Sequence, residues 1–529
     1  MCLSRDGDKV SGFKSNLPLL AMCPLWRRLA IPLVYDHVFV QYEGRPTRSG
    51  GLFTVDPNVT EPTDVAVKTN LGLVAMAGCA HAVKRVRIDV HCLANPFPGW
   101  REVIQRMHDV ASTWGVVDLT VEMHPDLFHF DARNLDMDKY TDDVAEVGDL
   151  LAALMPDVRR LECGGVNQNP IARTLYGRLA GHYADQLQKL ISQHPIAVPV
   201  GSRFTKLQKV EVSYDYVAGY QLPQIQSEEL VDMSLTNGPP NHSWASFSTD
   251  GDPRAIEFTK LTNLHAAYGK TYEDNGAAVH HRDGHPWKLC FPSLENLDIH
   301  CMQDTCPLLE YAVLPPRMES ISIKLKAAAY QEIANVVLPV TQCIALGIAV
   351  QAPSDLDGFP VINRILDRVR GSEVLKLKIE DSAIPVVPES ITCTTLTHLK
   401  VLPPTTVDTM LAFIERLPNL AKLSLYGLDV SEIQADMSIP DADHNTLVEP
   451  IHASLSQLII YGHRMRHYPD KAVAVAKYML LRVPTLTTLI AIYTPKTPVL
   501  NFVDAYAPRH PNLSSVQLTL DEGKHTGNH

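Results

Sequence analysis

The sequence has few of the features that mark a membrane protein, a secreted protein or a disulfide scaffold. No apolar run reaches the roughly 18 residues that span a bilayer, and the polar start MCLSRDGDKVSGFK does not resemble a secretory signal. Ten cysteines in 529 residues are too sparse for a disulfide framework. These absences predict a protein of a reducing compartment, cytoplasmic or nuclear, that does not enter a membrane.

The sequence also lacks long runs of like charge and the short motifs of common enzymes. Its 47 Lys and Arg against 59 Asp and Glu give a formal charge of −12, which disfavours a broad nucleic-acid footprint. It has no Gly-rich phosphate loop, no dinucleotide fingerprint, no His-Glu-x-x-His and no Gly-x-Ser-x-Gly. We therefore expect no enzyme and no cofactor, and a partner that is a protein rather than a nucleic acid.

One region contains residue types that bind zinc in other proteins, but at unusual spacing. They are His280, His281, His285, Cys290, His300, Cys301 and Cys306. No Cys-x-x-Cys is matched by a second such pair, and the interval from Cys290 to Cys301 crosses a predicted strand. This spacing favours a His-rich insert followed by ordinary core cysteines, and we predict no metal site.

What the sequence does contain is an internal repeat. In LPNLAKLSLYGLDV, Leu420, Leu423 and Leu425 follow the spacing L-x-x-L-x-L, and FPSLENLDIHC is a near copy. We find about 14 units of this kind between residues 79 and 522, at irregular intervals. A Pro precedes many of them, and because Pro cannot continue a helix it ends the preceding segment before a short strand begins.

The segments between these units have helical periodicity. Apolar residues of the segment before Leu420 recur at helical spacing, namely Met410, Leu411, Ile414 and Leu417. Similar periodicity predicts helices near residues 99–111, 143–154, 174–193, 471–482 and 501–508. Each unit is then a helix, a turn and a short strand, and such a crossover returns the chain to a parallel neighbour.

This pattern resembles the leucine-rich repeat family, which implies an α/β solenoid with a curved parallel sheet inside and helices outside. The resemblance covers residues 79–522, with inserts expected near 216–257, 268–289 and 427–450 and a tail at 523–529. The family's usual Asn or Cys after the last core Leu is absent, since Met302 and Leu428 are among the residues at that position. We therefore expect irregular repeats.

The stretch LLAMCPLWRRLAIPLVYDHVFV, from Leu19 to Val40, matches a second pattern. Its apolar residues fall on one helical stripe, and Pro32 ends the predicted helix. The stretch resembles the second half of an F-box, with matching residues at Leu20, Cys23, Trp26, Leu29, Leu33 and Tyr35. It is similar to the N-termini of fungal F-box-like leucine-rich proteins, but residues 1–16 supply no first half, so the F-box is expected to be truncated or degenerate.

F-box proteins are substrate receptors of cullin-type ubiquitin ligases, so the resemblance implies that this stretch contacts the ligase adaptor. The alternative is a helical cap, at residues 1–45, that shields the core of the first repeat. Residues 46–78 are then expected to be a linker. The sequence thus leaves two functions open, a protein-recognition module that serves as a ubiquitin-ligase substrate receptor, or a leucine-rich scaffold without a ubiquitin role.

The sheet face is the predicted binding surface. The first, fourth and sixth positions of each unit are expected to point inward, so the third, fifth and seventh face the concave side. These positions are charged in the early units, as at Arg85, Arg87 and Asp89, but apolar or aromatic in the late ones, at Tyr426, Ile459, Tyr461, Ile490 and Ile492. We predict a protein-binding patch there. The alternatives are a patch covered by a segment such as 427–450, or a register shifted by one residue.

Overall fold

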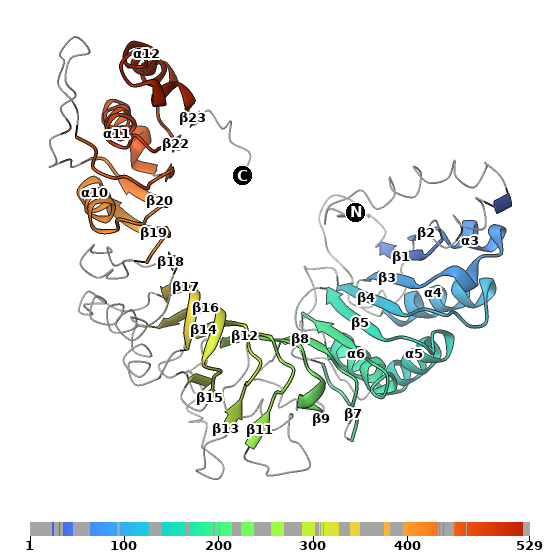
Figure 1. The fold of residues 1–529 in the computed structure, drawn as a ribbon. Coiled ribbons are helices and arrows are strands. Elements are labelled where there is room, and N and C mark those ends of the chain that lie inside the picture. Colours follow the sequence, from blue (N-terminus) through green and yellow to red (C-terminus); the bar gives the residue numbers. More distant parts are fainter. Residues whose placement is uncertain are drawn as a thin grey trace, which may run out of the picture. The chain divides into compact units, whose positions relative to one another are not determined.

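The structure is a computed structural model of the chain. It describes residues 24–25, 31, 35–45, 64–92, 96–125, 140–165, 170–193, 196–199, 201–213, 224–236, 255–268, 288–301, 306, 308–309, 312–326, 339–349, 375–380, 395–431, 433, 437, 449–461 and 463–521. The chain forms two compact units, the first comprising residues 1–261 and 281–290 and the second residues 262–280 and 291–529. Both units are built of parallel strands with helices on one face (Figure 1).

The first unit contains eight of the 18 strands that form the main sheet structure. In spatial order these are β2 (Asp64–Thr69), β1 (His37–Arg45), β3 (Arg85–Cys92), β4 (Asp118–Pro125), β5 (Arg160–Gly165), β6 (Lys189–Ser192), β8 (Lys209–Ser213) and β10 (Asp232–Thr236). Only β1 and β2 are antiparallel. The helices are α3 (Leu71–Ala77), α4 (Phe97–Val110), α5 (Thr141–Leu154) and α6 (Pro170–His182).

Short elements complete this unit, namely η1 (Ala80–Ala82), β7 (Arg203–Phe204), β9 (Gln224–Ile225), η5 (Ser227–Glu229), β11 (Ala255–Glu257) and β13 (Lys288–Cys290). Helix α4 illustrates how the sequence builds the core. Pro98 lies in its first turn, where a missing N–H is tolerated. Its buried residues include Trp100, Val103, Ile104 and Met107, which recur at helical spacing and form one apolar stripe.

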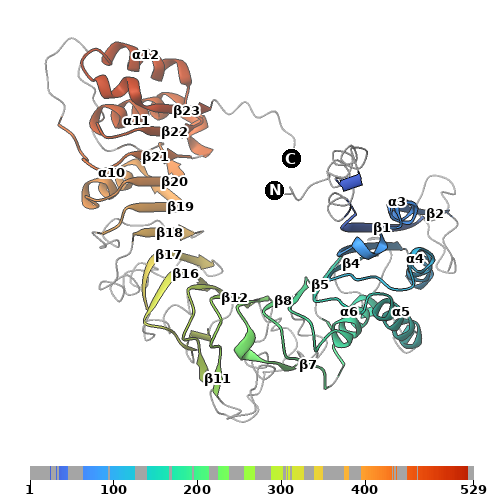
Figure 2. The same cartoon turned by 45° about the vertical axis from the view of Figure 1, so that its right-hand side comes forward.

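The second unit contains the other ten strands, and all of their pairings are parallel. They are β12 (Asn263–Tyr268), β14 (Asn296–Cys301), β16 (Arg317–Lys326), β17 (Val340–Ala349), β18 (Lys376–Glu380), β19 (His398–Thr406), β20 (Lys422–Asp429), β21 (Gln457–Ile460), β22 (Thr488–Ile492) and β23 (Gln517–Asp521). Helices α10 (Val407–Arg416), α11 (Pro469–Arg482) and α12 (Lys496–Tyr506) cover one side of the last strands (Figure 2). The short elements are β15 (Ala312–Val313), η9 (His463–His467) and η10 (Pro511–Ser515).

The register of the second unit aligns equivalent positions of the sequence pattern. Leu423 of β20 is opposite Leu399 of β19 and Leu458 of β21, and Leu458 is in turn opposite Leu489 of β22. All four side chains are buried. Because side chains alternate between the faces of a strand, the residues between them lie on the face that the helices leave open.

The predicted α/β class with a parallel sheet is confirmed, and the predicted helices near 99–111, 143–154, 471–482 and 501–508 correspond to α4, α5, α11 and α12. The prediction of one helix over 174–193 is wrong in its second half. There α6 ends at His182 and β6 follows. Tyr183, Leu187 and Leu190 have helical spacing and are buried, but Tyr183 lies in a turn, Leu190 lies in β6 and Leu187 lies between them.

The sheet also extends beyond the boundaries that the repeat pattern suggested. Strand β1 lies within the expected cap at 1–45, and β2 and α3 lie within the expected linker at 46–78. Strand β10 belongs to the main sheet although it lies in the expected insert at 216–257. Among the described residues no helix has the length and hydropathy needed to cross a membrane.

Candidate functional site

A row of three tyrosines lies at the ends of neighbouring strands in the second unit. The ring centroids of Tyr426 and Tyr461 are 6.3 Å apart, and those of Tyr461 and Tyr493 are 5.6 Å apart. The ring pairs are tilted by 45° and 46°, within the range of favourable aromatic contacts. We call Tyr426, Tyr461 and Tyr493 the tyrosine row.

Backbone pairing places the first two members of this row. Leu425 of β20 is opposite Ile460 of β21, so the residues that follow them, Tyr426 and Tyr461, are neighbours. The N–H of Tyr461 donates to the carbonyl oxygen of Leu425 at 2.8 Å, and the N–H of Leu428 donates to that of Tyr461 at 3.1 Å. Tyr426 is 39% exposed and Tyr461 is half-buried, so both rings lie at the surface.

Tyr493 was not predicted from the sequence, because strict alternation after Ile492 points residue 493 inward. Its backbone instead has a φ of 65°, the only positive φ of a non-glycine residue in the described part of the chain. This left-handed conformation is rare for a bulky residue, and it turns the ring toward Tyr461. A side-chain hydrogen bond to Tyr493, together with burial, raises the pKa of Tyr461.

The three isoleucines of the predicted patch lie beside this row. Ile459 is opposite Ser424 on one side and Ile490 on the other, and Ile492 is two residues further along β22. All three isoleucines are half-buried. The structure therefore brings together the five residues of the predicted patch. Residues 438–448, in the segment expected as a cover, lie outside the described residues.

Lysines occupy the same face of the adjoining strands. Lys376, His398 and Lys422 are neighbours in register on β18, β19 and β20, and Lys400 is two residues beyond His398. Burial lowers the pKa of His398, and the charges of Lys376 and Lys422 lower it further. The Nζ atom of Lys400 lies 4.6 Å from the ring centroid of Tyr426, which is cation–π distance. The basic group and the tyrosine row therefore form one continuous surface.

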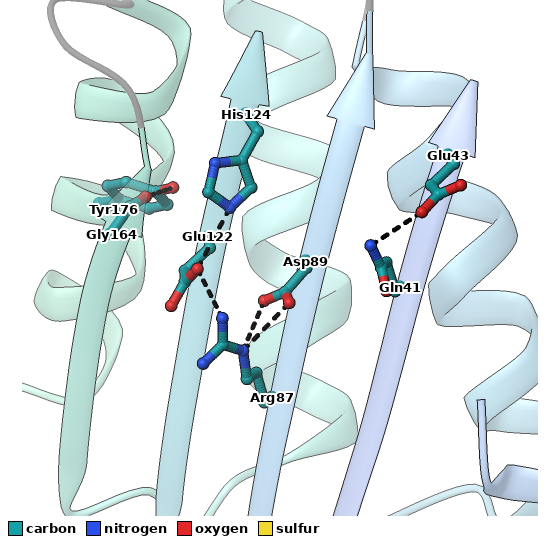
Figure 3. A network of polar contacts seen from close by, with 8 residues as sticks. All are labelled: Gln41, Glu43, Arg87, Asp89, Glu122, His124, Gly164 and Tyr176. Carbon is teal, nitrogen blue, oxygen red and sulfur yellow. Dashed lines mark hydrogen bonds and ion pairs between the residues drawn. The ribbon is translucent and has the colours of Figure 1, made fainter. Parts of the chain in front are cut away.

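The open face of the first unit has a different, charged character (Figure 3). Arg87 of β3 donates from Nε to the carboxylate of Asp89 at 2.9 and 3.1 Å, and from a terminal nitrogen to Glu122 of β4 at 2.8 Å. Glu122 also contacts Nε2 of His124 at 3.2 Å. Burial lowers the pKa of Arg87, but the hydrogen bond to Asp89 and the surrounding carboxylates outweigh this and raise it.

Two features adjoin this network. His91 stacks on His124 at 4.4 Å between ring centroids, and its pKa is lowered first by burial and then by His124, against the opposing effect of nearby carboxylates. The second feature is a cavity of about 300 Å³ that shares Arg87 with the network. Its other lining residues are His37, Arg85, Val86, Asp118, Thr120 and Glu162. The ion pair between Arg87 and Glu122 links the neighbouring strands β3 and β4.

Of the residues considered as metal ligands, His280, His281 and His285 lie outside the described residues. Cys301 and Cys306 are buried and Cys290 is half-buried, without a disulfide. No group of three metal-binding side chains occurs among the residues that the structure describes.

Most of the F-box-like residues, namely Leu20, Cys23, Trp26, Leu29 and Leu33, also lie outside the described residues. Tyr35 is described and is buried, with its N–H donating to the carbonyl oxygen of Ile31 at 2.9 Å. Burial, and secondarily Cys79, raises the pKa of its hydroxyl. Tyr35 therefore packs against the body of the first unit.

Comparisons with known proteins supply no identity. No protein-family model matches the chain, and no curated protein matches it.

Proposed function

We propose that this chain is an irregular repeat protein of the leucine-rich type that recognises another protein through the open face of its sheet, and that it is not an enzyme. The observation that carries this proposal is the tyrosine row and its adjoining isoleucines, which lie on that face at Tyr426, Tyr461, Tyr493, Ile459, Ile490 and Ile492.

The repeat assignment is supported by the register. Pattern positions that are equivalent in sequence are also opposite each other in space, as in the series Leu399, Leu423, Leu458 and Leu489. A stack of units that each contribute one strand to a shared core is how a solenoid forms. In such a stack the alternate positions form an extended surface, which suits a large partner better than a small substrate.

The recognition role is supported by the chemistry of the surface. Aromatic side chains supply large contact areas at a small cost in side-chain entropy, and they are favoured as anchors of protein interfaces. A folded protein rarely gathers apolar and aromatic groups on an open face without a use for them.

A role as ubiquitin-ligase substrate receptor is the more specific form of this proposal. It rests on the sequence resemblance of Leu20, Cys23, Trp26, Leu29 and Leu33 to an F-box. The alternative is a scaffold without a ubiquitin role, for which the N-terminal stretch only covers the end of the sheet. The buried position of Tyr35 is compatible with both roles.

The recognition role is tested by crosslinked affinity capture with the full-length chain, quantified by mass spectrometry. The variant is the double substitution Tyr426→Ala with Tyr461→Ala. The matched control is Tyr468→Ala, because Tyr468 is 40% exposed, Tyr426 is 39% exposed and both lie in the second unit. We expect specific partners to be lost from the double variant and retained by the control. Identical partner sets for all three proteins would contradict the proposal.

The ligase role is tested separately by mixing the full-length chain with the purified adaptor of a cullin-type ligase. A complex on size-exclusion chromatography that is lost on Trp26→Ala supports the receptor role. Failure to bind, with partner capture intact, favours the scaffold.

A further inference from the structure

The lysines beside the tyrosine row give the proposed binding face a definite charge preference. Lys376, Lys400 and Lys422 project from β18, β19 and β20 on the face that carries the tyrosine row. No carboxylate of the described residues forms an ion pair with any of the three. Three neighbouring cations without internal counter-charges raise the local potential, and the chain as a whole has a formal charge of −12.

The first unit provides a contrast that makes this group stand out. There several cations of the open face form ion pairs within the chain, since Arg87 contacts Asp89 and Glu122, and Arg85 contacts Asp36. Lys209 likewise pairs with Asp232. Lys376, Lys400 and Lys422 differ from these paired cations, since none of the three forms an ion pair with a described carboxylate.

The apolar part of the surface lies directly beside the basic part. Lys400 contacts the ring of Tyr426, which contacts Tyr461, which in turn contacts Tyr493. Tyr493 is held in a rare backbone conformation, and strained residues of this kind are concentrated at functional sites. The backbone conformation of Tyr493 thus sets its ring against that of Tyr461 in the chain without a partner.

We propose that this face binds an extended acidic segment of a partner protein, with carboxylates at Lys376, Lys400 and Lys422 and an apolar or aromatic side chain on the tyrosine row. The inference rests on the proposed recognition function and names the chemistry of its partner. Neighbouring strands are about 4.8 Å apart, so the distance from β18 to β22 is about 19 Å, which about six extended residues cover. One short segment therefore reaches both parts of the surface.

An acidic peptide fits this surface better than a nucleic acid does. Nucleic-acid sites follow a phosphate backbone with a long basic stripe. Here the lysines end at β20, and the next two strands carry Ile459, Ile490 and Ile492 on the same face. Those isoleucines favour an apolar side chain.

The experiment is a selection from a random 12-residue phage-displayed library on the immobilised full-length chain. The selected phage are compared across four proteins. These are the wild type, the triple reversal Lys376→Glu, Lys400→Glu, Lys422→Glu, the double variant Tyr426→Ala, Tyr461→Ala, and the control Tyr468→Ala. Circular dichroism melts of all four proteins establish that each is folded. The lysine reversal and the double tyrosine variant change different residues, so each tests one part of the surface separately.

We expect peptides rich in Asp and Glu with an adjacent aromatic or branched apolar residue to be enriched on the wild type and the control. A synthesised peptide of this kind should bind the triple reversal at least about tenfold more weakly, and raising the salt concentration should weaken its binding to the wild type. The double tyrosine variant should also lose binding, but its residual binding should still depend on salt.

Three results would overturn the inference. One is the absence of any enriched peptide, another is enrichment without acidic residues, and the third is equal enrichment on the charge-reversed protein. An oligo-dT strand that binds more tightly than the selected peptide and is lost on the triple reversal would assign the face to nucleic acid instead. If non-acidic peptides are selected while crosslinked capture still depends on the tyrosines, the recognition function stands and only the charge preference is wrong.

Discussion

Replacing Arg87 with Met tests whether the charged network of the first unit holds its strands together. The substitution keeps most of the apolar stem of the side chain but removes the guanidinium. Asp89 and Glu122 then lose their shared partner, and Glu162, whose charge also acts on Arg87, remains nearby. Three carboxylates are left with reduced compensation on neighbouring strands.

The magnitude follows from the number and burial of the contacts. The side chain of Arg87 is 28% exposed, and those of Asp89 and Glu122 are 13% and 19% exposed. Hydrogen bonds between charged groups contribute about 1.5–3 kcal/mol each when buried and much less when exposed. For this half-buried pair of contacts we expect a loss of about 2–3 kcal/mol of unfolding free energy.

The pKa shift of Arg87 sets the pH range in which the effect should be lost. The pKa of Arg87 is raised in the folded chain, so its contribution is complete below the unfolded value and is lost only at strongly alkaline pH. The difference between the two proteins should therefore be unchanged between neutral pH and about pH 9.

Urea unfolding followed by tryptophan fluorescence measures this change. Trp100 and Trp114 are buried in the first unit, and residues 262–280 and 291–529 of the second unit contain no tryptophan, so the signal reports on the first unit. We expect the midpoint to fall by about 1 M urea at pH 7. The control is Arg101→Met, because Arg101 also contacts two carboxylates, but all three groups are between 31% and 49% exposed. Its loss should stay below about 1 kcal/mol.

Two results would refute this reasoning. One is a loss for Arg87→Met no larger than that for Arg101→Met. The other is a loss that disappears between neutral pH and about pH 9.

Three further predictions concern single groups. Thr494→Val should stabilise the second unit by about 1 kcal/mol in a thermal melt, because the buried hydroxyl has no partner among the described residues. Gly177→Ala should lower the stability of the first unit by more than about 2 kcal/mol in urea, because the added Cβ would lie 1.9 Å from the carbonyl oxygen of Ala197. Asp298→Asn should reduce the loss of unfolding free energy on acidification, by under about 1 kcal/mol. The pKa of Asp298 is lowered, first by its hydrogen bond to His265, so its contribution is present above the unfolded value and disappears as pH falls.

Each of these has a control or a contradicting result. Gly72→Ala is the control for Gly177→Ala, since no atom lies within 4 Å of the added Cβ, and it should not destabilise the chain. Destabilisation by Thr494→Val would show that the hydroxyl has a partner. An acid profile of Asp298→Asn that matches the wild type, measured by hydrogen exchange of β14, would show that the bond to His265 contributes nothing.

The sequence predicted much of the fold because its signals are local. The spacing of Leu420, Leu423 and Leu425, and the Pro before many of the units, depend only on the geometry of a strand and the end of a helix. The same reasoning put Tyr426 and Tyr461 on the open face of the sheet, since alternation along a strand decides which face a side chain occupies. It misread residues 183–193, where buried side chains at helical spacing belong to a turn and to β6.

By itself, the sequence determined that this chain forms parallel strands with intervening helices, that its early strands present charge and that its late strands present aromatic and apolar residues. Only the tertiary structure decided what those residues meet. The pairing of Arg87 with Glu122 links strands that are separated by an intervening helix. The place of Tyr493 in the tyrosine row depends on a φ of 65° that strand periodicity does not anticipate. The contact of Lys400 with Tyr426 depends on the register between β19 and β20. Contacts across strands are set by how segments pack, and no local spacing encodes that.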